Sequence, residues 1–266
     1  MHKIAIIIRK EWAEVFKNRM VLFTVAFMPL LLTAIPLIIL VTTGSIEAGS
    51  ETAGDFGEMP EQIGNLCPPE LKGMECMQVY LVSQFMLMFM ILPLAIPVTI
   101  AAYSIVGEKT TRSLEPLLAT PITTIELLLG KSLAAVIPAV AATDLAFAIF
   151  AAGAWLIVRE AKLLTALLDA RWLLAVLVVG PLMALAAVCV SVIVSSRVND
   201  PRVAEQISMV VIVPLLAIFF GQLAGLVYIN RQFVLAMAAI LLVLDMALFY
   251  AAERLFQRET ILTRWK

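Results

Sequence analysis

Residues 79 to 102 read VYLVSQFMLMFMILPLAIPVTIAA, a stretch without a single charged side chain. The hydrocarbon layer of a bilayer is about 30 Å thick, and a helix of roughly 20 apolar residues crosses it. The stretch therefore predicts a membrane-spanning helix. We expect kinks near Pro93 and Pro97, because proline cannot donate the helical hydrogen bond.

The rest of the chain has the same character. It is 62% hydrophobic and 15% charged, with a mean hydropathy of +1.00, whereas soluble domains carry roughly 45–50% apolar and about 25% charged residues. This composition predicts an all-α integral membrane protein in which one domain uses residues 1–266. We expect six transmembrane helices near residues 20–41, 79–102, 132–158, 172–194, 207–229 and 233–252.

The fifth of these segments ends on glycine-rich sequence. Gly221, Gln222 and Gly225 precede a connection of only three residues to the sixth segment. We expect the fifth helix to break there and partly re-enter the membrane.

The first nineteen residues differ from the spans. Apolar Ile4, Ile8, Trp12, Val15 and Phe16 share one helical stripe, and basic residues suit the headgroup layer. The pattern predicts an amphipathic helix that lies along the interface rather than crossing it. A frayed, positively charged tail is the alternative.

Lysine and arginine set the orientation. With both termini in the cytoplasm, fourteen of the nineteen basic residues lie inside, and the five outside are Lys72, Arg159, Lys162, Arg171 and Arg231. This asymmetry predicts a multi-pass protein of the cell membrane with cytoplasmic termini.

The connection over residues 44–78 is then a short, acidic extracytoplasmic loop. This loop contains seven acidic residues and a single lysine, Lys72. Cys67 and Cys76 share this loop without the spacing of a metal site. A disulfide between them and two free thiols are both compatible with the sequence, while Cys189 lies in an apolar run and reads as packing.

Catalytic chemistry is poorly represented. His2 is the single histidine, which argues against histidine-based catalysis and most metal sites, so no metal and no cofactor are expected in this chain. Gly130, Lys131 and Ser132 resemble the end of a phosphate-binding loop, but that loop needs a glycine where Ile125 stands. We interpret the tripeptide as the start of a helix.

The cytoplasmic connection between the second and third spans is the most informative segment. Residues 107 to 131 read GEKTTRSLEPLLATPITTIELLLGK. Glu108 and Arg112 are four residues apart and can pair on a helix, and Leu114, Leu117 and Leu118 form an apolar ridge. A short charged helix with such a ridge suits docking into a groove of a soluble protein, whereas a merely solvated loop is the alternative.

This run, with the RKEWAEVFKNR start and the ERLFQRETIL end of the chain, resembles permease subunits of type-2 ATP-binding-cassette transporters, particularly the sodium-efflux and drug-export branch. The likeness extends over most of the chain. The outer loop is much shorter than the outer domain of the sodium-efflux permeases, so sodium is not inferred as the substrate.

The resemblance implies six spans, cytoplasmic termini and export driven by a separate cassette ATPase. Two permeases, identical or related, would pair with two ATPase subunits that carry ATP and Mg, and nucleic acid is not expected as a partner. Residues 104–131 would be the coupling segment. Its expected contacts with the ATPase come from Glu108, Lys109, Arg112, Leu114, Glu115, Leu117 and Leu118.

The family also implies a substrate path between the two permeases, along the second and fifth spans. Polar residues in or beside those spans are candidates for it, although interhelical hydrogen bonding is the commoner role of such residues. These candidates are Gln84, Thr99, Gln206, Ser208 and Gln222.

Asp144 and Asp245 complete the candidate path. Both lie well inside apolar segments that contain no lysine or arginine, and a charged aspartate at the bilayer centre costs at least roughly 2.5–3.5 kcal/mol. Each is therefore either a structural carboxyl satisfied by its neighbours or a group on the transport path that binds a cation or proton.

Two other functions are compatible with an apolar chain. A stand-alone secondary transporter or channel would need its own coupling-ion site and often has inverted repeats, which are not apparent here. A membrane enzyme is the third class. The substrate itself, whether drug, lipid, peptide or ion, is not encoded in a pattern that we can interpret.

Overall fold

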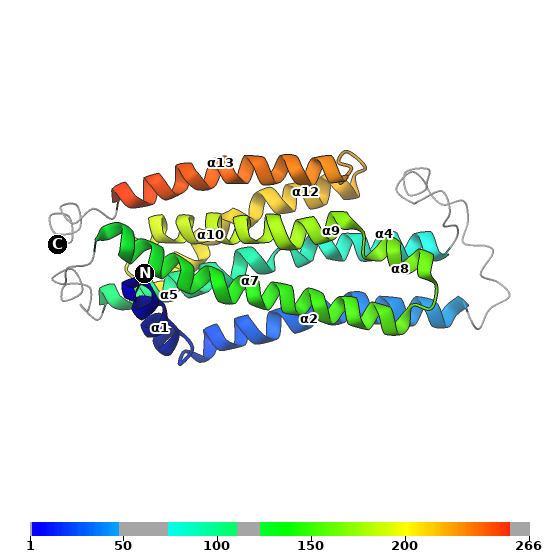
Figure 1. Cartoon of the computed structure of the whole chain (residues 1–266), viewed down its shortest axis with the longest axis horizontal. Coiled ribbons are helices and arrows are strands. Elements are labelled where there is room, and N and C mark those ends of the chain that lie inside the picture. The colour runs from blue at the N-terminus through cyan, green and yellow to red at the C-terminus, as the bar shows by residue number, and fades with distance from the viewer. Residues whose placement is uncertain (1, 48–73, 111–122, 256–266) are drawn as a thin grey trace.

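The computed structural model describes residues 2–47, 74–110 and 123–255, and all regular structure there is helical. Figure 1 shows the helices as one elongated bundle with most axes along its length. The elements are α1 His2–Val15, α2 Arg19–Glu47, α4 Met74–Phe89, α5 Leu92–Thr110, α7 Thr124–Ile157, α8 Ala161–Leu167, α9 Ala170–Leu174, the π-helix η1 Ala175–Val179, α10 Gly180–Ser195, α11 Pro201–Ser208, the 3₁₀-helix η2 Met209–Ile212, α12 Val213–Leu223 and α13 Arg231–Leu255.

Six helical stretches in this part of the chain are long and apolar enough to cross a membrane, which confirms the predicted fold class. They are Val21–Gly44, Glu75–Glu108, Ile125–Ile157, Ala161–Ser195, Pro201–Leu223 and Arg231–Leu255. Each predicted span falls on one of them. Several are longer than expected, since polar residues at their ends continue the helix beyond the apolar stretch.

Proline marks the places where the helices change. α4 ends at Phe89 and α5 begins at Leu92, one residue before Pro93, with two short turns from Met90 N to Leu87 O and from Ile91 N to Met88 O. The kink predicted at Pro93 is thus confirmed as a break between two helices, whereas Pro97 lies inside α5. Pro181 and Pro214 likewise sit at the first turns of α10 and α12, after the π- and 3₁₀-helical stretches.

The fifth segment differs from the prediction at both ends. It begins at Pro201 rather than Ile207, and it changes from α to 3₁₀ geometry over η2. α12 stops at Leu223, and Gly225 follows with a positive φ of 71°, a conformation that favours glycine. The helix therefore ends at Leu223, before the expected end at residue 229, and residues 224–230 connect it to α13. The predicted partial re-entry into the membrane stays a prediction.

The N-terminal helix lies across one end of the bundle, beside the end of α5 and the start of α7 (Figure 1). Its buried residues are Ile7, Glu11 and Val15. The predicted apolar stripe was therefore wrong in part, because it left out Ile7 and the carboxylate of Glu11. Glu11 lies on the face of α1 that packs against the rest of the protein, so its carboxylate has its partners within the chain.

α5 occupies the centre of the bundle. Every residue from 92 to 102 is buried, and α5 packs against α2, α7, α10, α11 and α1. A helix that is apolar and buried on all sides transmits any displacement to many neighbours. The cytoplasmic connection predicted for coupling leaves directly from its end.

Candidate functional site

The two ends of the predicted coupling segment, residues 104–110 and 123–131, lie within the described residues and are firmly built. On its far side, Thr123 caps α7: the Glu126 backbone N–H donates to Thr123 Oγ1 at 3.2 Å, and the Thr123 N–H donates to Glu126 Oε2 at 2.9 Å. This reciprocal capping box satisfies two amides that a helix start leaves open. Glu126 also forms an ion pair with Lys3 of α1 at 3.6 Å, so α1 touches the point where the segment ends.

A buried group of charges joins these flanks to α1. Lys131 of α7 is 2% exposed, and its Nζ lies 2.8 Å from Glu11 Oε1 and 2.7 Å from Glu108 Oε2. Lys10 Nζ lies 2.5 Å from the other carboxylate oxygen of Glu108. Lys131 also donates to Ser104 Oγ at 3.0 Å, and Ser104 donates to Glu11 Oε2. We call Lys10, Glu11, Ser104, Glu108 and Lys131 the ionic cluster.

The cluster is balanced in charge. It contains two ammonium and two carboxylate groups, and the side chains of Glu11 and Glu108 are only 3% and 4% exposed. Buried ions are tolerated only with close partners and further hydrogen bonds. Here Ser104 supplies the bridging hydroxyl between Lys131 and Glu11, so three helices distant in sequence are linked by one set of interactions.

Lys10 lies at the solvent side of the cluster, with 35% of its side chain exposed. Burial lowers its pKa, but the hydrogen bond to Glu108 and the carboxylates around it outweigh that effect and raise the pKa above its ordinary value of 10.5. A raised lysine pKa stabilises the fold below the ordinary value and loses this effect as pH rises through the raised one. Lys10 therefore keeps its charge across the physiological range.

Neutral contacts hold α1 in the same place. Trp12 Nε1 donates to the carbonyl of Ala134 at 2.9 Å. A Cβ atom on Gly130 would lie 2.8 Å from Ile7 Cγ2, so any other residue at this position of α7 requires the Ile7 side chain or α1 to shift. α7 begins at Thr124, so the Gly130–Lys131–Ser132 tripeptide lies inside this helix and the prediction that it starts a helix was wrong. Its glycine and lysine both contact α1.

One of the predicted coupling residues belongs to the ionic cluster, and most of the others lie outside the described residues. Glu108 is buried, with Lys10 and Lys131 as partners. Lys109 belongs to the last turn of α5. Outside the described residues lie Arg112, Leu114, Glu115, Leu117 and Leu118, so their contacts with an ATPase stay a prediction.

Two of the predicted path helices meet at a hydrogen bond. Thr99 of α5 donates to Glu205 Oε1 of α11 at 2.6 Å. Next to this contact, Ser208 is buried and donates to the carbonyl of Ala204 at 2.7 Å, while Gln206 is exposed. The second and fifth spans are therefore in direct polar contact.

The other two path residues lie elsewhere. Gln84 is buried on α4, and among the described residues neither atom of its amide group has a hydrogen-bond partner. Gln222 is buried near the end of α12, and its Oε1 likewise has no partner there. The candidate path residues do not form one cluster.

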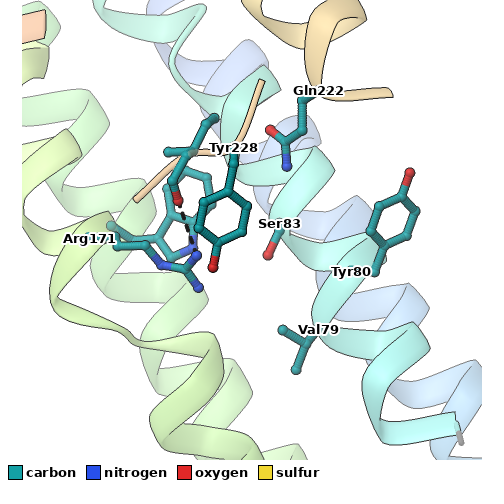
Figure 2. A pocket seen from close by; sticks show the side chains of 8 residues that line it. Val79, Tyr80, Ser83, Arg171, Gln222 and Tyr228 are labelled. Carbon is teal, nitrogen blue, oxygen red and sulfur yellow. Dashed lines mark hydrogen bonds between the residues drawn. The ribbon is translucent and has the colours of Figure 1, made fainter. Parts of the chain in front are cut away.

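Gln222 lines a small pocket at the opposite end of the bundle from the ionic cluster. Figure 2 shows Arg171 and Tyr228 side by side, and Arg171 Nη1 donates to the Ile229 carbonyl at 3.2 Å. Arg171 also pairs with Asp169. The lining residues are Val79, Tyr80, Ser83, Arg171, Trp172, Gln222, Tyr228 and Ile229.

The two aspartates inside spans have different surroundings from the cluster. Asp245 of α13 is 4% exposed, and within the described ranges neither of its carboxylate oxygens has a hydrogen-bond partner. Asp144 of α7 is half-buried, and its Oδ1 is equally unpartnered there. Thr143, which the sequence suggested as a neighbouring partner, donates to the Ala139 carbonyl at 2.8 Å instead.

The two cysteines within the described residues differ in whether they form a disulfide. Cys189 is free and buried in α10, and Cys76 at the start of α4 is disulfide-bonded. Cys67 lies outside the described residues, so its pairing with Cys76 stays a prediction. Among the residues that the structure describes, no group of histidine, cysteine and acidic side chains is arranged to hold a metal ion.

Sequence reasoning missed Glu11, Lys131 and Glu205. A usable signal existed for Lys131, which stands between LLLG and SLAAVI: a lysine in such an apolar helix requires a carboxylate partner. Glu205 was missed because the fifth span was expected to begin after it.

Within the described residues, six apolar helical stretches long enough to cross a membrane form one elongated bundle. α1 lies across one end of this bundle and is held there by buried charges. This arrangement defines a multi-pass membrane protein. Its sequence matches the model of the ABC-2 family transporter proteins over residues 5–256. The chain belongs to this family and is the membrane component of an ABC-2 transporter, which confirms the resemblance at family level. No individual curated protein matches the chain significantly.

Proposed function

We propose that this chain is the permease subunit of an ATP-driven exporter, that it forms the substrate path as a dimer, and that a separate cassette ATPase drives it through residues 104–131. The observation that carries the proposal is the family match over residues 5–256. The buried cluster supports it, because Ser104, Glu108 and Lys131 lie at the two ends of residues 104–131, and a segment that receives force needs rigid ends.

Within this proposal, both termini and residues 104–131 face the cytoplasm, and residues 44–78 face outside. The distribution of lysine and arginine supports this orientation. Labelling of a cysteine introduced at Glu58, with impermeant reagents applied from each side, tests it. Reaction from the cytoplasmic side alone would overturn the orientation and the coupling assignment.

Purification of the tagged chain from its native membranes tests the partner. We expect a cassette ATPase to co-purify in equal number with the permease, as identified by mass spectrometry. Leu114→Asp and Leu117→Asp should reduce this co-purification, since they place a charge on the apolar ridge. Arg112→Ala and Glu115→Ala should leave the complex intact and lower the transport obtained per ATP.

Recovery of the chain without any ATPase, in membranes where it is active, would favour the secondary transporter or channel. Normal assembly and transport in all four variants would show that residues 112–117 form an ordinary loop. Sodium-efflux and drug-export branches are both compatible with the family match, and direct transport assays of the purified complex decide between them.

A further inference from the structure

We infer that the small pocket lined by Arg171 and Gln222 binds one phospholipid by its headgroup. The class of ligand is a glycerophospholipid whose small headgroup donates a hydrogen bond, such as phosphatidylethanolamine. The inference goes beyond the proposed function and uses it only to assign the site to the outer leaflet of the membrane.

The connection between α12 and α13 closes one side of this pocket. The backbone N–H groups of Leu226 and Val227 both donate to the Gly221 carbonyl, at 2.8 and 3.1 Å. A Cβ atom on Gly221 would lie 2.8 Å from Val227 Cγ2, so the connection lies directly against α12. This close contact places Tyr228 and Ile229 among the lining residues, together with side chains of α4 and α9.

Gln222 gives the pocket a buried acceptor. Its side chain is 6% exposed, and among the described residues its Oε1 has no hydrogen-bond partner. A buried acceptor without a donor is unfavourable, so the site favours a ligand that brings one. The enclosed space is about 20 Å³, which holds about one water-sized group. The ligand therefore enters with one small end, and that end donates a hydrogen bond.

Arg171 gives the same pocket a cationic donor. Figure 2 shows its guanidinium and the Gln222 amide on either side of the Tyr228 ring. One nitrogen donates to the Ile229 carbonyl, and Asp169 pairs with the group. A guanidinium has five N–H donors, and their planar arrangement matches the oxygens of a phosphate. Because Asp169 offsets the charge of Arg171, a zwitterionic headgroup suits this site.

The surroundings of the pocket favour a lipid over a free phosphate. Exposed apolar side chains lie within four residues of Gln222 on the chain, namely Phe220, Leu223 and Leu226. Such side chains at the end of a membrane span contact acyl chains, and Trp and Tyr residues, which also line this pocket, are typical of the headgroup level. A phospholipid satisfies all three features with its headgroup donor at Gln222, its phosphate at Arg171 and its acyl chains along α12.

The first experiment compares two lipids that differ only in the headgroup amine. The chain is delipidated in detergent and titrated with dioleoylphosphatidylethanolamine or dioleoylphosphatidylcholine, and bound lipid is counted by native mass spectrometry. Choline is larger and has no hydrogen-bond donor, so the ethanolamine lipid should bind about five- to tenfold tighter to the wild type. Gln222→Leu should remove this preference, because the acceptor is gone. Equal affinities of the wild type for the two lipids would overturn the inference.

The role of Arg171 has a matched control at the same end of the bundle. Arg171→Met should weaken the binding of both lipids about tenfold, since both carry the phosphate. Arg159→Met removes an exposed arginine that does not line the pocket, and it should change either affinity less than about twofold. If Arg171→Met does not fold, Arg171→Lys keeps the charge, loses the planar fork and should weaken binding severalfold. Equal losses at positions 159 and 171 would show nonspecific charge attraction and overturn the inference.

Soluble competitors distinguish a lipid from a free phosphate ester. Glycerophosphoethanolamine and inorganic phosphate are added to the complex with the ethanolamine lipid. Because neither has acyl chains, displacement should need a concentration at least about a hundredfold above that of the lipid. Displacement at equal concentration would assign the pocket to a soluble phosphate ester and overturn the lipid assignment.

The second experiment locates the bound lipid. Phosphatidylethanolamine with a photoreactive diazirine in one acyl chain is crosslinked in detergent, and the labelled peptides are identified. We expect crosslinks within residues 213–229 that excess unmodified lipid removes and that Gln222→Leu reduces severalfold. Crosslinks confined to other spans would overturn the inference. Neither experiment involves an ATPase, so failure of the proposed function would change the assignment of the leaflet and leave these results standing.

Discussion

The ionic cluster and the carboxyls inside the spans satisfy the same physical requirement in opposite ways. Glu11 and Glu108 are as deeply buried as Asp245, yet each is within 3 Å of an ammonium group. In the described part of the chain, Asp245 and Glu205 have no lysine or arginine partner. The cluster therefore depends on charge pairing, whereas Glu205 depends on the hydroxyl of Thr99 and Asp245 has no hydrogen-bond partner among the described residues.

The largest loss of stability is expected where a buried ion pair is broken. Lys131→Met leaves Glu108 with Lys10 and the buried Glu11 carboxylate without an ammonium partner from α7, and should cost about 3–5 kcal/mol of stability. The measurement is the apparent melting temperature of the protein in detergent. Lys3→Met, which breaks the exposed pair with Glu126, should change stability by less than about 1 kcal/mol. Equal melting temperatures for both variants would mean that the cluster is not stabilising.

A smaller loss of stability is expected when the hydroxyl that donates a hydrogen bond to a carboxylate is removed. Thr99→Val preserves shape but removes the hydrogen bond to Glu205, which should cost about 1–2 kcal/mol because the acceptor is a carboxylate. Thr99→Ser keeps the hydroxyl and is the control. If the valine variant melts like the serine variant, the α5–α11 contact does not depend on this bond.

Glycine substitutions sharpen the comparison by separating packing from charge. Gly130→Ala gains about 1 kcal/mol of helix propensity but pushes Ile7, and with it α1, away from α7, so a net loss of about 1 kcal/mol is expected. Gly107→Ala, where no atom lies within 4 Å of the new Cβ, should be stabilising. Shifts of the same sign in the two melting temperatures would contradict the close approach of α1 and α7.

Asp245→Asn should have the smallest effect on stability, below about 1 kcal/mol, because no cation is left behind when its charge is removed. Its effect on transport decides the role of this group. If transport and ATP hydrolysis of Asp245→Asn and Asp144→Asn equal the wild type from pH 5 to 9, both are structural carboxyls. A loss confined to one variant would assign a path role to that aspartate.

Composition was enough to predict the spans, because roughly twenty apolar residues in succession have few alternatives to crossing a bilayer. The break at Pro93 followed from the chemistry of proline. The ionic cluster was not predictable as a whole, since Glu11, Glu108 and Lys131 are brought together only by the packing of α1 on α7. The sequence pattern of α1 did not reveal the burial of Ile7 and Glu11, because a carboxylate is not part of an apolar stripe and its partner Lys131 lies far along the chain.

The separation of Glu11 and Lys131 along the chain also sets an order of assembly. Their 120 residues take about 6 to 24 s to synthesise at ordinary translation rates. During that interval Glu11 has no ammonium partner from α7, and water is the remaining solvent for its charge. The N-terminal helix can therefore complete its buried contacts only after the segment that carries Lys131 has been made.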